Sequence, residues 1–273
     1  MRLVGTACAI AKSRGTRVIS ILTVNYHTGT QLAELIRSLH DHPPSCPWEI
    51  VVTNNSPVER IDAGRLGDNV TVLEATNVGF AAGINMAFRR SRGDVLMIAN
   101  PDVRVTAGAL DRAVASLSAM PDVGVILPRL RYPEGAVQPS VRRFYSWPVV
   151  LFARSPLRWL GGRPAFFRRY LYEDLDATRS ADVDWGLGGA MFLRRKDADE
   201  DGPFDARFFL YFEDVDLCLR MWRKGLRVHY LPAVEMVHAH RRSSRNPLSA
   251  AGWHHFRSMV RFIVKHRGLP RRP

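Results

Sequence analysis

The chain has 273 residues, of which 46% are hydrophobic and 24% charged, a composition typical of a globular protein with a sizeable core. Its longest apolar runs, such as PVVLFA at 148–153, are far shorter than the ~20 residues that cross a bilayer. Lys12 and Arg14 interrupt the apolar N-terminal stretch too early for a signal peptide. We therefore expect neither a membrane span nor a signal peptide, and the three cysteines, which cannot all pair, favour a reducing compartment.

Predicted elements alternate regularly over the first 128 residues. Buried-strand patterns are followed by helical spacing, as in 32–40, where apolar residues recur at i, i+3, i+4 and i+7. The predicted strands are 17–26, 48–53, 69–75, 94–99 and 123–128, and the predicted helices are 32–40, 79–92 and 107–120. This order favours an α/β fold with a largely parallel sheet that helices cover on both faces.

The alternation is lost for about 55 residues after Pro128, and a connection of that length is usually functional or mobile. Beyond it we expect strands at 188–195 and 226–232 and a helix at 212–225. The last element is an amphipathic helix over 253–266. Its apolar face carries Phe256, Val260, Ile263 and Val264, and its basic face carries Arg257, Arg261 and Lys265.

The net charge of +13 is concentrated in two segments. Residues 241–273 contain nine Lys and Arg and no acid, and residues 129–169 contain nine Arg, one Glu and many aromatic side chains. Such segments favour an anionic partner, which at this point is a nucleic acid, an acidic membrane surface or a phosphorylated substrate.

Several well-marked enzyme classes are excluded because their motifs are missing. No GxGxxG follows the first strand, and GxxxxGK[ST], HExxH, GxSxG and CxxC do not occur. Three groups of polar residues remain as candidates for chemistry: Asp102 in the Asn-Pro-Asp turn after the strand at 94–99, Glu213-Asp214-Val215-Asp216 at a helix start, and His238-Ala239-His240.

Each group has a structural and a functional interpretation. Asn-Pro-Asp is common in turns, but a carboxylate at the carboxyl end of a strand also lies where open α/β sheets bind ligands. Helix capping explains one acid near 213, but not three carboxylates in four positions. A lone histidine is more often structural than a ligand, and the pair only modestly favours a ligand.

Taken together, these blocks identify a resemblance. NVGFAAGINMAF, DVLMIANPDV, GPFDARFFLYFEDVDLCLRMWRKG and VEMVHAHRRSS resemble the family 2 inverting glycosyltransferases, most of all the bacterial rhamnosyltransferase branch. Matching blocks run from about Arg17 to His266. The resemblance implies a GT-A fold, an α/β nucleotide-sugar-binding fold with a mostly parallel central sheet and helices on both faces.

The same resemblance implies one glycosyltransferase domain over 1–273. Within it we expect a nucleotide-sugar-binding half at 17–128, a basic aromatic loop region at 129–187, an acceptor and catalytic part at 188–240, and a basic amphipathic C-terminal helix at 241–273. The implied reaction moves a sugar, with L-rhamnose from dTDP-rhamnose as the expected donor, to a hydroxyl of a glycan or polyprenyl-diphosphate-linked acceptor in cell-envelope polysaccharide synthesis. The enzyme would be cytoplasmic and peripheral on the inner face of the cytoplasmic membrane, bound to its anionic surface.

Residue roles follow from the matched motifs. The resemblance makes Asp214 the base that deprotonates the acceptor hydroxyl, with Glu213 either orienting it or touching the acceptor. Asp102 and His238 become ligands of a divalent cation, Mg²⁺ or Mn²⁺, on the donor diphosphate, and His240 is a weaker candidate. The expected donor-binding residues are Asn25, Thr53, Asn54, Asn77, Gly79, Gly83, Asn85, Asn100 and Asp102, and the expected acceptor-binding residues are Trp185, Gly189, Asp216 and Arg220.

One position departs from the family. Relatives read VVDNNS after the second strand, whereas this chain reads VVTNNS, with Thr53 in place of the aspartate near the pyrimidine ring. An oxygen of Thr53 or Asn54 is then the expected acceptor for the pyrimidine N3–H. The departure leaves the nucleotide, and hence another nucleotide-sugar donor, open.

Two other function classes were weighed. A nucleic-acid-binding protein would explain the basic aromatic segments but not the acids and histidines, and no RNP, zinc-finger or helix-turn-helix signature is present. A nucleotidyltransferase would carry a glycine-rich loop with a lysine after its first strand, where this chain has VNYHTGT. We therefore expect a nucleotide-sugar and a glycan or lipid-linked acceptor as partners, and no nucleic acid.

Overall fold

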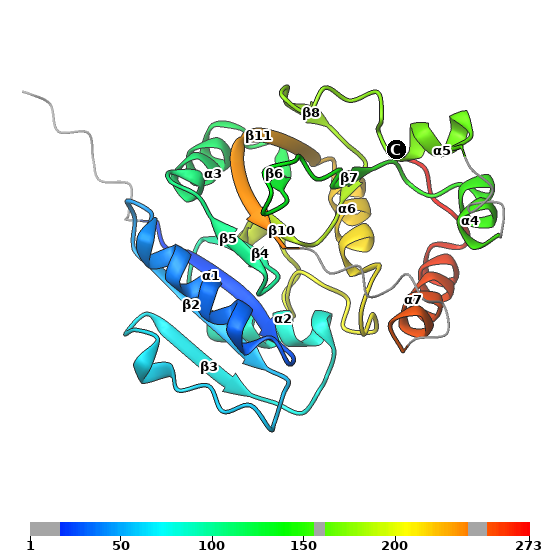
Figure 1. Ribbon diagram of the computed structural model, residues 1–273. Coiled ribbons are helices and arrows are strands. Elements are labelled where there is room, and N and C mark those ends of the chain that lie inside the picture. Colours follow the sequence, from blue (N-terminus) through cyan, green and yellow to red (C-terminus); the bar gives the residue numbers. More distant parts are fainter. Residues whose placement is uncertain (1–16, 156–161, 240–249) are drawn as a thin grey trace, which may run out of the picture.

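The parallel half of the central sheet is formed by the N-terminal strands (Figure 1). The computed structural model describes residues 17–155, 162–239 and 250–273, to which all structural statements refer. The four strands lie in the order β3-β2-β1-β4 and all run in the same direction. Their bounds are β1 Ile19–Asn25, β2 Trp48–Asn54, β3 Val70–Glu74 and β4 Val95–Ala99.

The other half of the sheet is mixed in direction. β10 (Ala190–Arg194) lies between β4 and β6 (Val123–Arg131) and is antiparallel to both. β11 (Arg227–His238) runs parallel to β6, and the short strands β5 (Val103–Val105) and β8 (Ala181–Asp182) pair antiparallel with β11. β1 to β4, β6 and β11 run in one direction and β5, β8 and β10 in the other, so the nine-stranded sheet is mostly parallel. The α/β prediction is confirmed.

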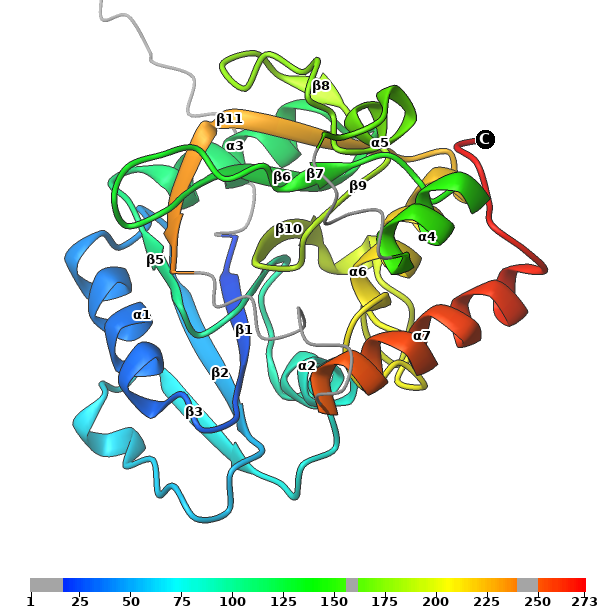
Figure 2. The same cartoon turned by 45° about the vertical axis from the view of Figure 1, so that its right-hand side comes forward.

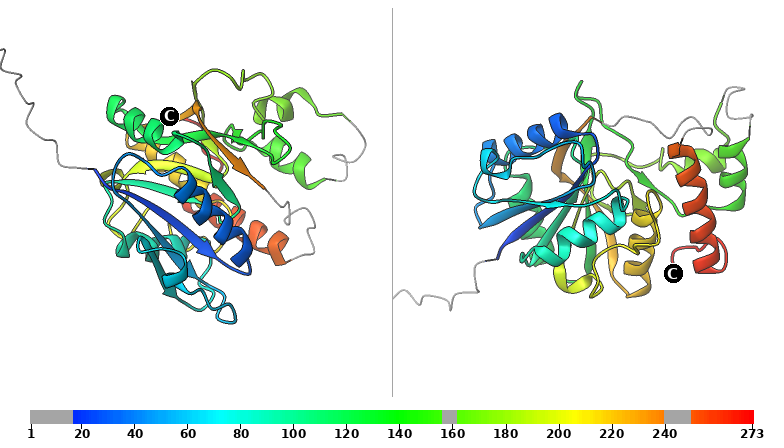
Figure 3. Two further views of the ribbon diagram at one scale, coloured as in Figure 1. Left: turned by 60° about the vertical axis from the view of Figure 1, so that its left-hand side comes forward. Right: turned by 90° about the horizontal axis from the view of Figure 1, so that it is seen from below.

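Helices cover both faces of this sheet (Figures 2 and 3). One core cluster joins α1 (Gly29–Asp41) and α3 (Ala109–Ala119) to one face, and a second joins α2 (Phe80–Arg90) and α6 (Glu213–Arg223) to the other. Successive side chains of a strand point to opposite faces of the sheet. Ile21 therefore belongs to the first cluster and its neighbour Leu22 to the second. The apolar stripe predicted for the first helix is buried, at Leu32, Leu35, Ile36 and Leu39.

Two strands, β6 and β11, extend well beyond their predicted ends, and β6 continues from 128 to Arg131. β11 does not stop at 232 but continues past Pro232 through a register shift between Leu231 and Glu235. The extension is held by Glu235, whose carboxylate accepts ion pairs from Arg129 (2.6 Å) and Arg131 (2.7 Å) on β6. It brings His238 opposite Val103 of β5, a strand that the sequence pattern did not predict.

The segment at 129–187 is not a plain loop. It contains α4 (Trp147–Arg154) and α5 (Ala165–Tyr170), and β7 (Val141–Arg142) pairs with β9 (Trp185–Gly186). These elements are too short, and too often interrupted by Pro and Arg, to leave a readable period in the sequence. Two 3₁₀ turns, η1 (Ala63–Arg65) and η3 (Arg195–Asp197), complete the elements.

The C-terminal helix α7 (Ala250–His266) lies beside α4 at one end of the molecule (Figures 1 to 3). The apolar face predicted for it is not the face that packs, because Phe256, Val260 and Val264 are 40%, 42% and 72% exposed. Ser258 and Phe262 are buried instead. Among the described residues, no helix combines the length and the apolar character that a membrane crossing requires.

A buried ion cluster fastens α7 to α6. The carboxylate of Asp216 is fully buried and accepts from Lys265 Nζ (2.6 Å), His266 Nε2 (2.8 Å) and Arg220 Nε (2.9 Å). Burial alone would raise the pKa of Asp216, but the hydrogen bond from His266 and the charge of Arg220 outweigh it, and the pKa is lowered. Asp216 therefore stays ionised at neutral pH and holds the two helices together.

We expect Asp216→Ala to lower the free energy of unfolding by about 3–5 kcal/mol at pH 7, because it leaves buried cations without their partner. Asp199→Ala is the matched control, since Asp199 also pairs with Arg220 but is 52% exposed, and it should cost less than about 1 kcal/mol. Urea denaturation measures both, and equal losses in the two variants would show that the cluster does not stabilise the docking of α7.

Candidate active site

The Asn-Pro-Asp turn after β4 is bonded to two other parts of the sheet. The backbone N–H of Asn100 donates to the Gly189 carbonyl (2.9 Å), just before β10 begins. The carbonyl of Asp102 accepts from the N–H of Ala239 (3.0 Å), just after β11 ends. Asp102 is therefore held at the carboxyl end of β4, where α/β sheets bind ligands.

His238 lies directly against this turn. It is 1% exposed, and its Nε2 lies 3.3 Å from Oδ1 of Asp102. Gly189 leaves the space that the ring occupies, since a Cβ there would lie 2.8 Å from Cε1 of His238. The structure thus brings the two predicted metal ligands together, while His240 lies outside the described residues.

The family resemblance implies a divalent cation at this turn, and the atoms that could bind it are those of Asp102 and His238. Nδ1 of His238 is 2.8 Å from Oε1 of Gln138, which can only accept, so Nδ1 donates to it and Nε2 is turned toward Asp102. A divalent cation would be held between Nε2 and the carboxylate. No cluster of three or more His, Cys, Asp or Glu suited to a metal occurs in the described part of the chain. The carboxylate of Asp102 and the imidazole of His238 are of the kind that would hold a Mg²⁺ or Mn²⁺ ion, with its other ligands coming from outside these two residues.

Two buried carboxyl groups open α6. Asp214 accepts backbone N–H groups from Gly188 (3.0 Å) and Val215 (2.8 Å), and burial nevertheless raises its pKa to about 6. Glu213 is 5% exposed, and its Oε2 has no hydrogen-bond partner among the described residues. Burial and the neighbouring charge of Asp214 raise the pKa of Glu213 well above its usual value. Asp214 is therefore the carboxylate that is ionised near neutral pH.

The two parts of the site meet at adjacent glycines. Gly188 donates its N–H to Asp214, and Gly189 lies against His238 and bonds to Asn100. Because the two glycines are consecutive, Asp214, the predicted base, and the predicted metal ligands border one region at the start of β10.

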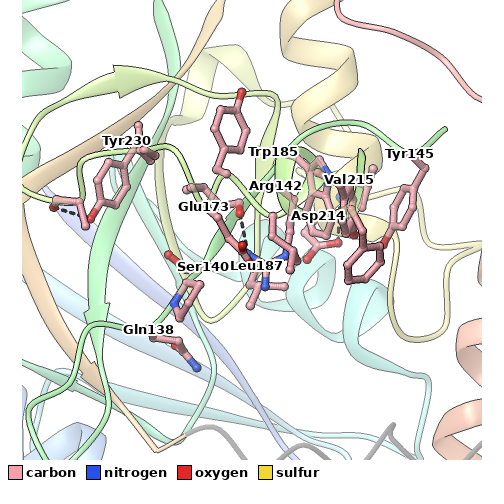
Figure 4. A pocket seen from close by; sticks show the side chains of 18 of the residues that line it. Gln138, Ser140, Arg142, Tyr145, Glu173, Trp185, Leu187, Asp214, Val215 and Tyr230 are labelled. Atoms are coloured by element: carbon pink, nitrogen blue, oxygen red, sulfur yellow. Dashed lines mark hydrogen bonds between the residues drawn. The ribbon is translucent and has the colours of Figure 1, made fainter. Parts of the chain in front are cut away.

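A cavity of about 720 Å³ opens beside Asp214 (Figure 4). Trp185 lines it as well and stacks on Tyr145, with ring centroids 5.7 Å apart. Most of the remaining wall comes from the basic aromatic segment and the chain just after it, including Gln138, Arg142, Arg163, Tyr170 and Tyr172. The cavity thus combines a carboxylate of raised pKa with aromatic faces and guanidinium groups.

The predicted donor residues on β1 and β2 hydrogen-bond within the protein, to each other and to neighbouring segments. Asn25 Nδ2 donates to Asn54 Oδ1 (2.9 Å), and Asn54 Nδ2 donates to Glu74 Oε2 (2.8 Å). The hydroxyl of Thr53 donates to the Gly83 carbonyl (2.8 Å). In this part of the sheet, Oγ1 of Thr23 on β1 and Oδ1 of Asn55 are buried without a partner among the described residues, and neither was predicted.

The remaining predicted donor residues shape the start of α2. Gly79 has φ 86°, and a Cβ there would lie 2.5 Å from the Phe209 carbonyl oxygen, so only glycine fits. Asn77 Oδ1 accepts from the N–H of Gly79 (3.2 Å). Gly83 packs against Val24, where a Cβ would lie 2.8 Å from Cγ2. Asn85 uses both ends of its amide on the backbone of Phe204.

Two predicted acceptor residues have other partners. Asp216 and Arg220 belong to the ion cluster that holds α7, and neither lines the cavity. Trp185 does line it, and Gly189 lies beside His238. Gln138 and the cavity tyrosines were not predicted singly. Their one sequence signal was the concentration of Arg and aromatic residues in 129–169.

Comparison with curated proteins finds rhamnosyltransferases. The chain is 27% identical over 277 residues to the N-acetylglucosaminyl-diphospho-decaprenol L-rhamnosyltransferase of Mycobacterium tuberculosis (strain H37Rv), an alignment that covers 94% of this chain and 88% of that protein. It is 38% identical over 90 residues to the rhamnosyltransferase WbbL of Escherichia coli (strain K12), covering 33% of this chain and 34% of that one.

Comparison with solved structures supports the fold. GalNAc-T7 with UDP, GalNAc and Mn²⁺ superposes with a TM-score of 0.67 at 15% identity, over 91% of this chain and 48% of the other. The mannosyltransferase PcManGT of Pyrobaculum calidifontis, with GDP-Man and Mn²⁺, superposes with a TM-score of 0.60 at 17% identity, over 94% of this chain and 66% of the other. The predicted GT-A fold is confirmed.

A sequence profile decides the family. The profile of glycosyl transferase family 2 matches residues 20–202, which is well over half of the chain. The match includes β1 to β4, the Asn-Pro-Asp turn, the cavity segment and β10. The chain belongs to glycosyl transferase family 2.

Proposed function

We propose that this glycosyltransferase transfers L-rhamnose from dTDP-rhamnose, with inversion and with a divalent cation, to a hydroxyl of a polyprenyl-diphosphate-linked or other glycan acceptor in cell-envelope polysaccharide synthesis. The observation that carries the proposal is the position of Asp214, which bonds to Gly188 next to the Asp102–His238 pair and also lines the cavity. The names of the two rhamnosyltransferase relatives support the sugar and the lipid-linked acceptor.

Asp214 acts as the general base. A sugar hydroxyl is a weak nucleophile and must lose its proton as it attacks the anomeric carbon. A carboxylate with a pKa raised to about 6 is ionised at neutral pH and still basic enough to accept that proton. The hydroxyl approaches from the cavity and the diphosphate leaves toward Asp102 and His238, so attack from the opposite face inverts the anomeric centre.

Asp102 and His238 hold the donor end. When bound, a Mg²⁺ or Mn²⁺ ion offsets the negative charge that develops on the departing diphosphate. Asp102 is placed to bind it by the bonds of its turn to β10 and β11, and His238 by its packing against Gly189. The free Oδ1 of Asn55 near the ends of β1 and β2 is our candidate for recognition of the base, with a different nucleotide-sugar as the alternative donor.

The cavity holds the acceptor. Its aromatic faces, among them Trp185 and Tyr145, suit the apolar faces of sugar rings, and Arg142 and Arg163 suit an acceptor diphosphate. Nucleic acid is not proposed as a partner, because the site provides a base and a cation-binding pair that nucleic-acid binding would not use.

The protein is proposed to work on the anionic inner face of the cytoplasmic membrane. Of the ten large apolar side chains exposed in the described residues, seven lie on α4, α5 and α7. None of these helices contains Asp or Glu, while all three contain Arg. Tyr170 of α5 and His255 of α7 line the acceptor cavity, so a membrane docked on these helices would lie close to its mouth.

Asp214→Asn is expected to abolish sugar transfer, and wild-type kcat/KM is expected to fall about tenfold per pH unit below the pKa of about 6 as the base becomes protonated. Transfer from a panel of nucleotide-sugars, with and without a chelator, measures the loss and identifies the donor. Since burial raises the pKa of Asp214, the folded state disfavours its ionised form, and the variant should be at least as stable as wild type at pH 8. Full transfer by a folded Asp214→Asn variant would disprove the assignment.

Gly189→Ala should reduce transfer about 100-fold, because its new methyl group would displace the ring of His238. Gly188→Ala is the control, since a Cβ there meets Asp214 at an ordinary 3.6 Å and the N–H that binds Asp214 is kept. Initial rates at saturating donor, with thermal unfolding of both variants, make the comparison. Similar rates for the two alanines would remove His238 from the site.

Val264→Glu should weaken binding to phosphatidylglycerol vesicles about tenfold, because it places a charge on the exposed apolar face of α7. Val58→Glu makes the same change at a side chain that is 80% exposed, in the turn after β2, and should bind like wild type. Co-sedimentation at low and high salt tests both, with release at high salt expected. Equal binding by the two variants, or self-association of wild type through α7 without vesicle binding, would exclude this docking face.

A further inference from the structure

Gln138 has a buried side-chain amide, and only one of its two polar ends has a hydrogen-bond partner among the described residues. It lies in the connection between β6 and β7, 3% exposed, and its backbone N–H donates to the Leu130 carbonyl (2.8 Å). The nearby Ser140 carbonyl accepts from the N–H of Leu187 (2.8 Å), which fixes the same connection to the chain entering β10. The side chain of Gln138 is therefore held between the end of β11 and the cavity.

One end of the amide determines the state of His238. Oε1 of Gln138 accepts from Nδ1 of His238 (2.8 Å), which fixes a proton on Nδ1 and turns Nε2 toward Asp102. Ligating histidines are commonly oriented in this way through the nitrogen that does not bind. This contact makes Gln138 a positioning residue for His238.

The other end of the amide, Nε2, lacks a hydrogen-bond acceptor in the described part of the chain. Nε2 of Gln138 is buried and has no hydrogen-bond partner among the described residues, although the residue lines the cavity that Asp214 also lines (Figure 4). A buried N–H group without an acceptor is unfavourable, so such a group in a binding cavity indicates an oxygen atom supplied by a ligand.

We infer that Gln138 binds substrate, with its Nε2–H donating to a phosphate or hydroxyl oxygen at the junction between the Asp102–His238 pair and the acceptor cavity. The inference rests on the proposed function and assigns a further residue to it. Because one rigid amide contacts both His238 and the substrate oxygen, Gln138 joins the cation-binding end of the site to the cavity. The oxygen belongs either to the donor diphosphate or to the acceptor, and the experiment below separates these sources.

Two variants divide the roles of the amide. Gln138→Glu keeps an oxygen for Nδ1 of His238 but replaces the N–H donor with an acceptor, and Gln138→Met removes both at similar size. We expect both to lower kcat/KM for transfer by about 10- to 100-fold, as is usual when a buried polar contact to substrate is lost. Only Gln138→Met should change the tautomer of His238, which ¹⁵N NMR of the ring reports. Gln31→Glu, the same change on α1 at a half-buried position that lines no described cavity, should behave like wild type.

Calorimetry with dTDP and Mg²⁺ identifies the source of the oxygen. If Nε2 binds the donor diphosphate, Gln138→Glu should weaken dTDP binding about tenfold or more. If it binds the acceptor, dTDP binding stays unchanged while transfer falls. Transfer and dTDP binding by Gln138→Glu both within about twofold of wild type would overturn the substrate contact, and an unchanged His238 tautomer in Gln138→Met would overturn the positioning role. The NMR readout needs no turnover, so a failure of the proposed function is recognised separately.

Discussion

The reversed direction of β10 is the constraint on which the site depends. A strand that followed β4 in a purely parallel sheet would begin at the opposite edge, whereas β10 begins where β4 ends, with Ala190 opposite Ala99. The residues that enter β10 are therefore Gly188 and Gly189, and they arrive at the carboxyl edge of the sheet, beside the Asn-Pro-Asp turn. Because neither has a side chain, α6 and His238 can both approach this point. One reversed strand thereby brings Asp214, the proposed base, next to Asp102 and His238.

Burial and charge divide the acids of one helix turn into two functions. Asp214 and Asp216 are two residues apart and both buried, yet burial dominates at Asp214 and raises its pKa, whereas the hydrogen bond from His266 and the charge of Arg220 prevail at Asp216 and lower it. Successive helical positions point in different directions, so Asp214 meets backbone N–H groups and the cavity while Asp216 meets the cations of α6 and α7. The cluster around Asp216 thus supports α7, and Asp214 remains free for chemistry.

Sequence reasoning succeeded where a single local signal was sufficient. The periods of the first strands and helices predicted their elements to within a few residues. The matched motifs pointed to Asp102, Asp214 and His238: His238 lies against Asp102 and Asp214 bonds to Gly188 nearby, while their roles stay predictions. It failed where the outcome depends on distant partners. β5 is three residues long and exists because β11 passes Pro232, which the Arg129–Glu235 pair makes favourable. The face of α7 that packs is likewise the one whose Lys265 and His266 pair with Asp216, and not the apolar stripe of the helix itself.

The segment between β6 and β10 builds the cavity, although the sheet itself does not require so long a connection. β6 and β10 are antiparallel neighbours, which a short hairpin could join, whereas in this chain the connection between them supplies α4, α5, β7 and β9. The same residues form most of the cavity wall, so the chain that reverses β10 also surrounds the space in front of Asp214. Gln138 connects this segment to the turn after β4, because its backbone belongs to the segment while its amide contacts His238. The residues that enclose the cavity therefore also help to hold the ring of His238 beside Asp102.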